Sequence, residues 1–183
     1  NRYATEIGYE ILKKGGNAVD AAVAVGFALA VTLPRAGNLG GGGFILIYEK
    51  ETQKVSSIDY RSAAPVAAKS EMFISDNKVQ RFGHLVNAVP GSVAGLLKAH
   101  KDHGSLSLPE LLKPSIELAR EGFEVSYDLN YVLEWGKESM LMNETSKKKF
   151  YDQSSEPLKV KSIFKQPLPV SYTHLTLPTT RLV

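Results

Sequence analysis

The sequence predicts an α+β domain, because helical patterns flank a pair of strand-like segments in a chain of ordinary globular composition. Apolar residues recur at helical spacing near the start of the chain, and two short runs between residues 44 and 60 have the length of strands. The 183 residues are 43% hydrophobic and 22% charged, which is typical of a folded domain with a substantial core.

Composition argues against several classes of function. The 22 Lys and Arg residues barely outnumber the 19 Asp and Glu residues, and the single cationic run, 147–149, is expected to be a solvated helix end rather than a nucleic-acid patch. The chain has no cysteine, so disulfides, thiol catalysis and Cys-ligated zinc are excluded. The longest apolar stretch, 18–33, is interrupted by Asp20 and is too short for a membrane span.

Two helices are expected at the start of the chain. Ile7 and Ile11 lie on one helical face, and the glycine pair 15–16 ends this segment. Asn17 can cap a second helix, with Asp20 in the capping-box position. The residues that follow are alanine-rich and apolar nearly all round, which predicts a buried helix.

A β-hairpin is expected next, and helices after it. Residues 44–48 and 55–60 read as two strands joined by a turn. One helix is expected over 90–100, and Ser107 with Glu110 predicts a capping box for the next, which Pro114 is expected to bend or split. A further helix is expected from Tyr127 to about Glu138.

A glycine run is the most informative local feature. Residues 38–44 read Asn-Leu-Gly-Gly-Gly-Gly-Phe, and four consecutive glycines imply either positive φ or a very close approach of another chain segment. A phosphate cradle is disfavoured, because the order is helix, glycines, strand, and no Lys stands at the position that a P-loop needs. A tight structural loop and a loop that lines an active site both remain open.

Arg61 is the candidate binding residue, and it directly follows the second strand. Its planar guanidinium suits bidentate binding of a carboxylate, although the residues alone favour a surface or structural ion pair with Asp59 or a distant acid over that role. His84, His100 and His103 lack metal-ligand spacing and are expected at the surface or in helix caps. No nucleophile can be named, because Ser92 lies outside a Gly-x-Ser-x-Gly elbow.

Five motifs in order over about residues 5–169 closely resemble the start of the large subunit of the gamma-glutamyltransferase (gamma-glutamyltranspeptidase) family. They are Gly15-Gly-Asn-Ala-Val-Asp-Ala-Ala-Val, Gly37-Asn-Leu-Gly-Gly-Gly-Gly-Phe, Asp59-Tyr-Arg-Ser-Ala-Ala-Pro, Pro90-Gly-Ser-Val-Ala-Gly and Leu118-Ala-Arg-Glu-Gly-Phe.

The resemblance implies a fragment of a four-layer αββα N-terminal-nucleophile hydrolase, made as a precursor that cleaves itself into a large and a small subunit. The N-terminal Thr of the small subunit attacks the γ-glutamyl carbonyl, and the acyl group passes to water or an amino acid. Arg61 falls on the family's arginine that binds the α-carboxylate of the γ-glutamyl group. The partners implied are a substrate such as glutathione and the small subunit, and no cofactor or metal is expected.

The resemblance also sets limits. Ser62 stands where the family motif has Glu, which leaves fine substrate preference open. The nucleophile belongs to the part of the precursor outside this sequence, so the 183-residue chain is expected to be inactive. Two alternatives remain: a cephalosporin or glutaryl acylase of the same superfamily, or a non-catalytic binding module. Bacterial relatives imply a periplasmic or secreted protein.

The last residues form a separate segment. Residues 170–183 resemble one reading frame of a transposon-end sequencing adapter, so residues 1–169 are expected to be a partial large-subunit domain and 170–183 a non-native tail. The sequence is accordingly expected to be a fragment open at both ends.

Overall fold

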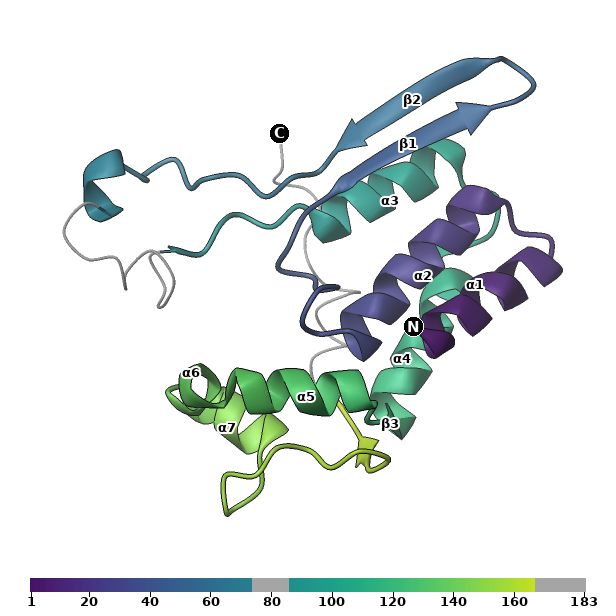
Figure 1. Cartoon of the computed structure of the whole chain (residues 1–183). Helices are drawn as coiled ribbons and strands as arrows, with labels where there is room; N and C mark the ends of the chain where they lie inside the picture. Colours follow the sequence, from purple (N-terminus) through teal and green to yellow (C-terminus); the bar gives the residue numbers. More distant parts are fainter. Residues whose placement is uncertain (74–85, 167–183) are drawn as a thin grey trace.

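The computed structural model describes residues 1–73 and 86–166 and confirms an α+β fold (Figure 1). Two small antiparallel sheets are set among seven α-helices in this described part. The elements are α1 (Arg2–Lys13), α2 (Ala18–Thr32), β1 (Phe44–Glu49), β2 (Lys54–Asp59), the 3-10 helix η1 (Ser70–Phe73), α3 (Ser92–His103), α4 (Leu108–Glu121), β3 (Phe123–Glu124), α5 (Tyr127–Trp135), α6 (Lys137–Leu141), α7 (Glu144–Phe150) and β4 (Ile163–Phe164).

The first two helices form as the sequence predicts. Gly15 has a φ of +89°, a conformation that side chains disfavour, and it lies in the turn after α1. The capping box at the start of α2 is present, because Asn17 Oδ1 accepts the backbone N–H of Asp20 at 2.9 Å, and Asp20 Oδ2 accepts that of Asn17 at 2.9 Å. Both helix ends are therefore set locally.

Asp20 also joins α2 to the loop after α3. Its carboxylate is fully buried and accepts hydrogen bonds from the backbone N–H of Ser105 (3.0 Å), the hydroxyl of Ser105 (2.5 Å) and the backbone N–H of Leu106 (3.3 Å). Burial alone would raise the pKa of Asp20, but these bonds and the one from Asn17 outweigh it and hold the pKa below its ordinary value. Asp20 is thus a buried anion satisfied by neutral donors.

The hairpin pairs β1 with β2 in the register Phe44↔Asp59 to Glu49↔Lys54. Ile47 and Ile58 point inward and join the core formed with α1, α2, α3 and α4. Figure 1 shows α3 running along the hairpin. The opposite face is open, because Phe44, Leu46 and Tyr48 are 65%, 77% and 61% exposed. Among the residues that the structure describes, the hairpin is covered on one side only.

A second core lies around α5 and the short β3–β4 pair. Phe123 pairs with Phe164 across the two strands, and Val31 at the end of α2 belongs to the same cluster. Tyr151 is buried here, and its hydroxyl donates to the carbonyl of Leu133 at 2.6 Å. In the described residues, no helix is long and apolar enough to cross a bilayer.

The helices differ from expectation in two places. The helix α4 is not split at Pro114, since buried Leu111, Leu112 and Ser115 hold both sides of the proline against the core while only one backbone donor is missing; a bend at Pro114 stays a prediction. The helix expected from Tyr127 to Glu138 ends at Trp135, and α6 begins after Gly136. The tail at 170–183 lies outside the described residues, so its origin stays a prediction.

Candidate functional site

The glycine run packs directly against the chain at Arg61. A Cβ on Gly42 would overlap the backbone N of Ser62 and lie 2.6 Å from the carbonyl O of Tyr60. A Cβ on Gly43 would lie 2.9 Å from the Tyr60 ring. In the described residues, positive φ among glycines occurs at Gly15 and Gly122 and not in the run. Close approach, rather than left-handed backbone, is therefore the reason for Gly42 and Gly43.

Two more glycines complete the same packing: Gly91, at the N-cap of α3, and Gly95, inside α3. A Cβ on Gly91 would overlap the carbonyl of Tyr60, and a Cβ on Gly95 would overlap its ring. We call Gly42, Gly43, Gly91 and Gly95 the Tyr60 socket. Sequence reasoning missed the role of both glycines, although Gly95 lies inside a helix, where glycine is disfavoured enough to signal a packing constraint.

The backbone around Arg61 is fixed on both sides. Tyr60 exchanges two backbone hydrogen bonds with Gly43, at 3.0 and 3.3 Å, and Ala63 exchanges two with Val89, at 2.8 and 3.1 Å. The backbone N–H of Arg61 donates to Asp59 Oδ1 at 2.9 Å. Arg61 thus stands in a short segment whose main chain is held by β1, the glycine run and the segment before α3.

The Arg61 side chain itself is exposed. Within the described part of the chain its guanidinium forms no ion pair, so the pairing with Asp59 that the residues alone left open is not observed. Asp59 instead accepts the backbone N–H of Arg61. The five guanidinium donors are consequently not committed to an acid in the described structure.

The N-terminus of α3 is used by the glycine run and not by an anion. The carbonyl of Gly41 accepts the backbone N–H groups of Gly91 (2.9 Å) and Ser92 (3.0 Å). These are among the unpaired donors that make helix N-termini bind phosphate. With both donors taken by a carbonyl, the geometry agrees with the sequence argument against a phosphate cradle.

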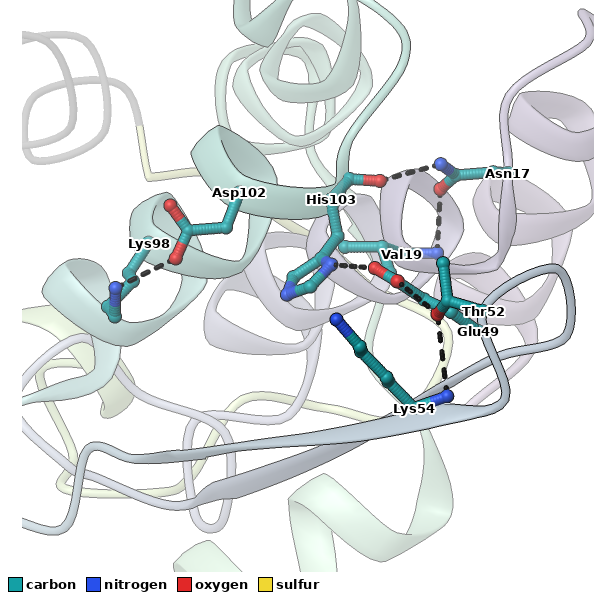
Figure 2. A network of polar contacts seen from close by, with 8 residues as sticks. All are labelled: Asn17, Val19, Glu49, Thr52, Lys54, Lys98, Asp102 and His103. Carbon is teal, nitrogen blue, oxygen red and sulfur yellow. Dashed lines mark hydrogen bonds and ion pairs between the residues drawn. The ribbon is translucent and has the colours of Figure 1, made fainter.

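The far end of the hairpin is attached to the end of α3, as Figure 2 shows. His103 Nδ1 donates to Glu49 Oε1 at 2.7 Å, and Asn17 Nδ2 donates to the carbonyl of His103 at 2.7 Å. The hydrogen bond from His103 and a further one from Thr52 lower the pKa of the Glu49 carboxyl. The hairpin is therefore held at both ends, by these bonds and by the Tyr60 socket.

The two histidines among the described residues, His100 and His103, have structural roles. His100 Nε2 lies 2.8 Å from the carbonyl O of Leu106, so its ring joins the end of α3 to the following loop, and His103 bonds Glu49. His84 lies outside the described residues. Among the described residues, no group of three or more His, Cys, Asp or Glu side chains is arranged to hold a metal ion.

Comparisons with known proteins agree on one family. The gamma-glutamyltranspeptidase family model matches residues 4–173. The glutathione hydrolase proenzyme of Escherichia coli K12 is 45% identical over 161 residues, which are 85% of this chain and 28% of the relative. The solved gamma-glutamyltranspeptidase of Helicobacter pylori superposes with a TM-score of 0.87 at 38% identity, over 91% of this chain and 49% of that one.

The fold is shared more widely than the family. The cephalosporin acylase of Bacillus halodurans superposes with a TM-score of 0.75 at 24% identity, over 90% of this chain and 32% of that one, a likeness that shows the fold alone. The chain spans little more than a quarter of the length of the E. coli relative. The match from residue 4 to 173 places the chain in the gamma-glutamyltranspeptidase family of N-terminal-nucleophile hydrolases.

Proposed function

We propose that the protein from which this chain comes cleaves γ-glutamyl amides such as glutathione and transfers the γ-glutamyl group to water or an amino acid. Family membership supports this, and the E. coli relative is named a glutathione hydrolase proenzyme. The single observation that carries the proposal is an exposed guanidinium, Arg61, on a backbone that is fixed on both sides. The described chain supplies a binding group and leaves the chemistry to the rest of the precursor.

Arg61 would bind the α-carboxylate of the γ-glutamyl group through two parallel N–H···O bonds. This contact fixes one end of the substrate, so the carbonyl at its other end meets the threonine hydroxyl of the small subunit. The hydroxyl oxygen forms the ester, the threonine amine takes the proton, and the leaving amine departs with it. Water or an amino acid then cleaves the ester and releases the threonine.

The small subunit is the proposed partner of the open hairpin face. Phe44, Leu46 and Tyr48 form an exposed apolar row on β1, and an uncovered face of this kind requires a partner layer. In the expected four-layer arrangement, residues 1–169 form part of the large subunit and this row packs on the second sheet. A periplasmic or secreted location is proposed from the family alone.

The test of Arg61 uses the complete enzyme. We expect Arg61→Ala to raise KM for a γ-glutamyl anilide and to lower kcat/KM by about 100-fold, since a charge-assisted bidentate pair is worth about 3 kcal/mol. Arg35→Ala is the matched control, because Arg35 is also partly exposed but already pairs with Asp128 at 3.0 Å. Unchanged kinetics for Arg61→Ala would remove the role assigned to it.

The acylase alternative shares the fold and is tested with the substrate. A glutaryl amide lacks the α-amino group of a γ-glutamyl amide, so the ratio of kcat/KM for the two substrates distinguishes a γ-glutamyltransferase from an acylase. We expect the γ-glutamyl substrate to be preferred. A non-catalytic protein is tested by reading the gene downstream, where the enzyme requires a threonine that becomes the N-terminus of the small subunit.

A further inference from the structure

Tyr60 is enclosed by glycines that come from two distant segments of the chain. Gly42 and Gly43 lie just before β1, whereas Gly91 and Gly95 lie at the start and within the first turns of α3. At each of the four positions a Cβ would come within 3 Å of Tyr60, at its ring or its carbonyl group. At these four positions the main chain therefore lies so close to Tyr60 that any residue larger than glycine would overlap it.

The packing fixes where Arg61 can point. Tyr60 is paired with Gly43 by backbone hydrogen bonds, so this part of the chain continues the hairpin ladder. Arg61 directly follows this paired residue and lies beyond β2, which ends at Asp59. With the Tyr60 ring half-buried in the socket, the Arg61 side chain projects outward, and it is exposed.

We propose that Tyr60, through its ring in the Tyr60 socket, is a positioning residue that sets the direction of the Arg61 guanidinium for carboxylate binding. This inference rests on the proposed function, because it assigns Tyr60 a role in the same carboxylate contact. The proposal assigns Tyr60 no contact with the substrate. It acts by preventing rotation of the segment that carries Arg61.

The ring makes more of these contacts than the hydroxyl, although a Cβ on Gly43 would also lie 2.9 Å from the hydroxyl oxygen. In the described structure the hydroxyl of Tyr60 has no hydrogen-bond partner, and burial raises its pKa. The atoms that would meet a Cβ at Gly95 are the Cβ, Cγ and Cδ1 of Tyr60. Tyr60→Phe should therefore keep the geometry, whereas Tyr60→Leu should leave part of the socket empty.

The readout is the preference for a charged α-carboxylate, measured in the complete enzyme. A γ-glutamyl anilide is compared with its α-carboxamide, which has the same shape but no carboxylate charge. We expect Tyr60→Leu to reduce the ratio of the two kcat/KM values about tenfold, mainly through KM for the charged substrate, as expected for about 1.4 kcal/mol of lost binding. Tyr60→Phe should retain the ratio. A residue with a merely structural role would lower both rates equally.

A double-mutant cycle shows whether Tyr60 acts through Arg61. In an Arg61→Ala background, Tyr60→Leu should no longer change the carboxylate preference, because the group it positions is absent. Gly95→Ala is the second variant, since its added Cβ would overlap the Cβ and ring of Tyr60 and so force Tyr60 and α3 apart without changing Tyr60 itself, and it should reproduce the Tyr60→Leu effect. Gly40→Ala is the control, because its Cβ would meet nothing closer than 3.5 Å.

The outcomes separate this inference from the proposed function. If Arg61→Ala leaves the carboxylate preference intact, the proposed role of Arg61 fails. If Arg61→Ala abolishes the preference while both Tyr60→Leu and Gly95→Ala retain it, the proposed function stands and the positioning role of Tyr60 is overturned. Equal effects of Tyr60→Leu with and without Arg61 would also overturn it.

Discussion

At the scale of single residues, neighbouring glycines of the run differ sharply in what surrounds them. A Cβ on Gly42 would meet three backbone atoms within 3 Å, whereas a Cβ on Gly40 would have Asn38 Oδ1 at 3.5 Å as its nearest neighbour. Neither residue has a positive φ. Only the space around Gly42 excludes a side chain.

We expect Gly42→Ala to destabilise the complete protein by about 3 kcal/mol or more, since the added methyl meets backbone that cannot move aside. Gly40→Ala should be neutral or slightly stabilising, because alanine reduces the freedom of the unfolded chain where the native conformation tolerates it. Thermal unfolding of both variants measures the difference. Equal midpoints would contradict the close-packing account of the run.

The sequence predicted two possible reasons for the glycine run but could not choose between them. The sequence indicated either positive φ or close approach, and the structure has close approach to Tyr60 and Ser62. A single sequence does not reveal which distant segment packs against a run of glycines. For the same reason the part played by Gly91 and Gly95 was missed, since it depends on α3 lying against the end of the hairpin.

At the scale of elements, the sequence predicted the structures that depend on residues close together in the chain. The capping boxes at Asn17 and Ser107 and the hairpin over 44–60 are present, because each depends on residues close in sequence. The β3–β4 pair was not predicted, since its two-residue strands are too short to show a period and their paired residues are 39 and 41 positions apart. Tertiary contacts form that pair.

Asp20 provides a test at this scale, because it joins α2 to the loop after α3. Its carboxylate satisfies buried donors from Asn17, Ser105 and Leu106, so Asp20→Asn should cost about 3 kcal/mol at neutral pH. The native pKa of Asp20 lies below its ordinary value of 3.8. Its stabilisation is therefore present above pH 3.8 and is lost as the pH falls through the native pKa.

We expect the difference in thermal midpoint between wild type and Asp20→Asn to be large at pH 7 and to shrink below pH 3.8. Asp102→Asn is the matched control, because that carboxylate forms a surface pair with Lys98 at 2.7 Å (Figure 2), and exposed pairs of this kind contribute little to stability. A difference for Asp20→Asn that does not change with pH would show that the carboxylate charge is not what stabilises this junction.

At the scale of the whole molecule, the described chain leaves two apolar surfaces open. One is the row of Phe44, Leu46 and Tyr48 on β1, and the other is a row on α5 in which Tyr127 and Trp135 are 73% and 81% exposed. A net charge of +3 provides little repulsion between copies. In addition, β1 and β2 pair only with each other in the described sheet, so the outer edge of each strand has unpaired backbone groups.

We therefore expect residues 1–169, expressed alone, to aggregate or to remain partly folded, because no other subunit covers these surfaces. Leu46→Lys should increase the soluble fraction, since Leu46 is 77% exposed and a lysine there interrupts the apolar row. Ile47→Lys is the matched control one residue away. Ile47 is buried against the core, so a charge there should lower the soluble yield further.

The measurement is size-exclusion chromatography with light scattering on the soluble fraction, followed by thermal unfolding. The alternation of side chains along β1 makes the two lysine variants opposite in effect, although they differ by one position in the chain. A monomeric wild-type fragment that melts cooperatively would contradict the expectation, because it would mean that the open face of the hairpin needs no partner layer. Co-expression with the remainder of the precursor should restore a soluble protein if that layer is supplied by the same gene.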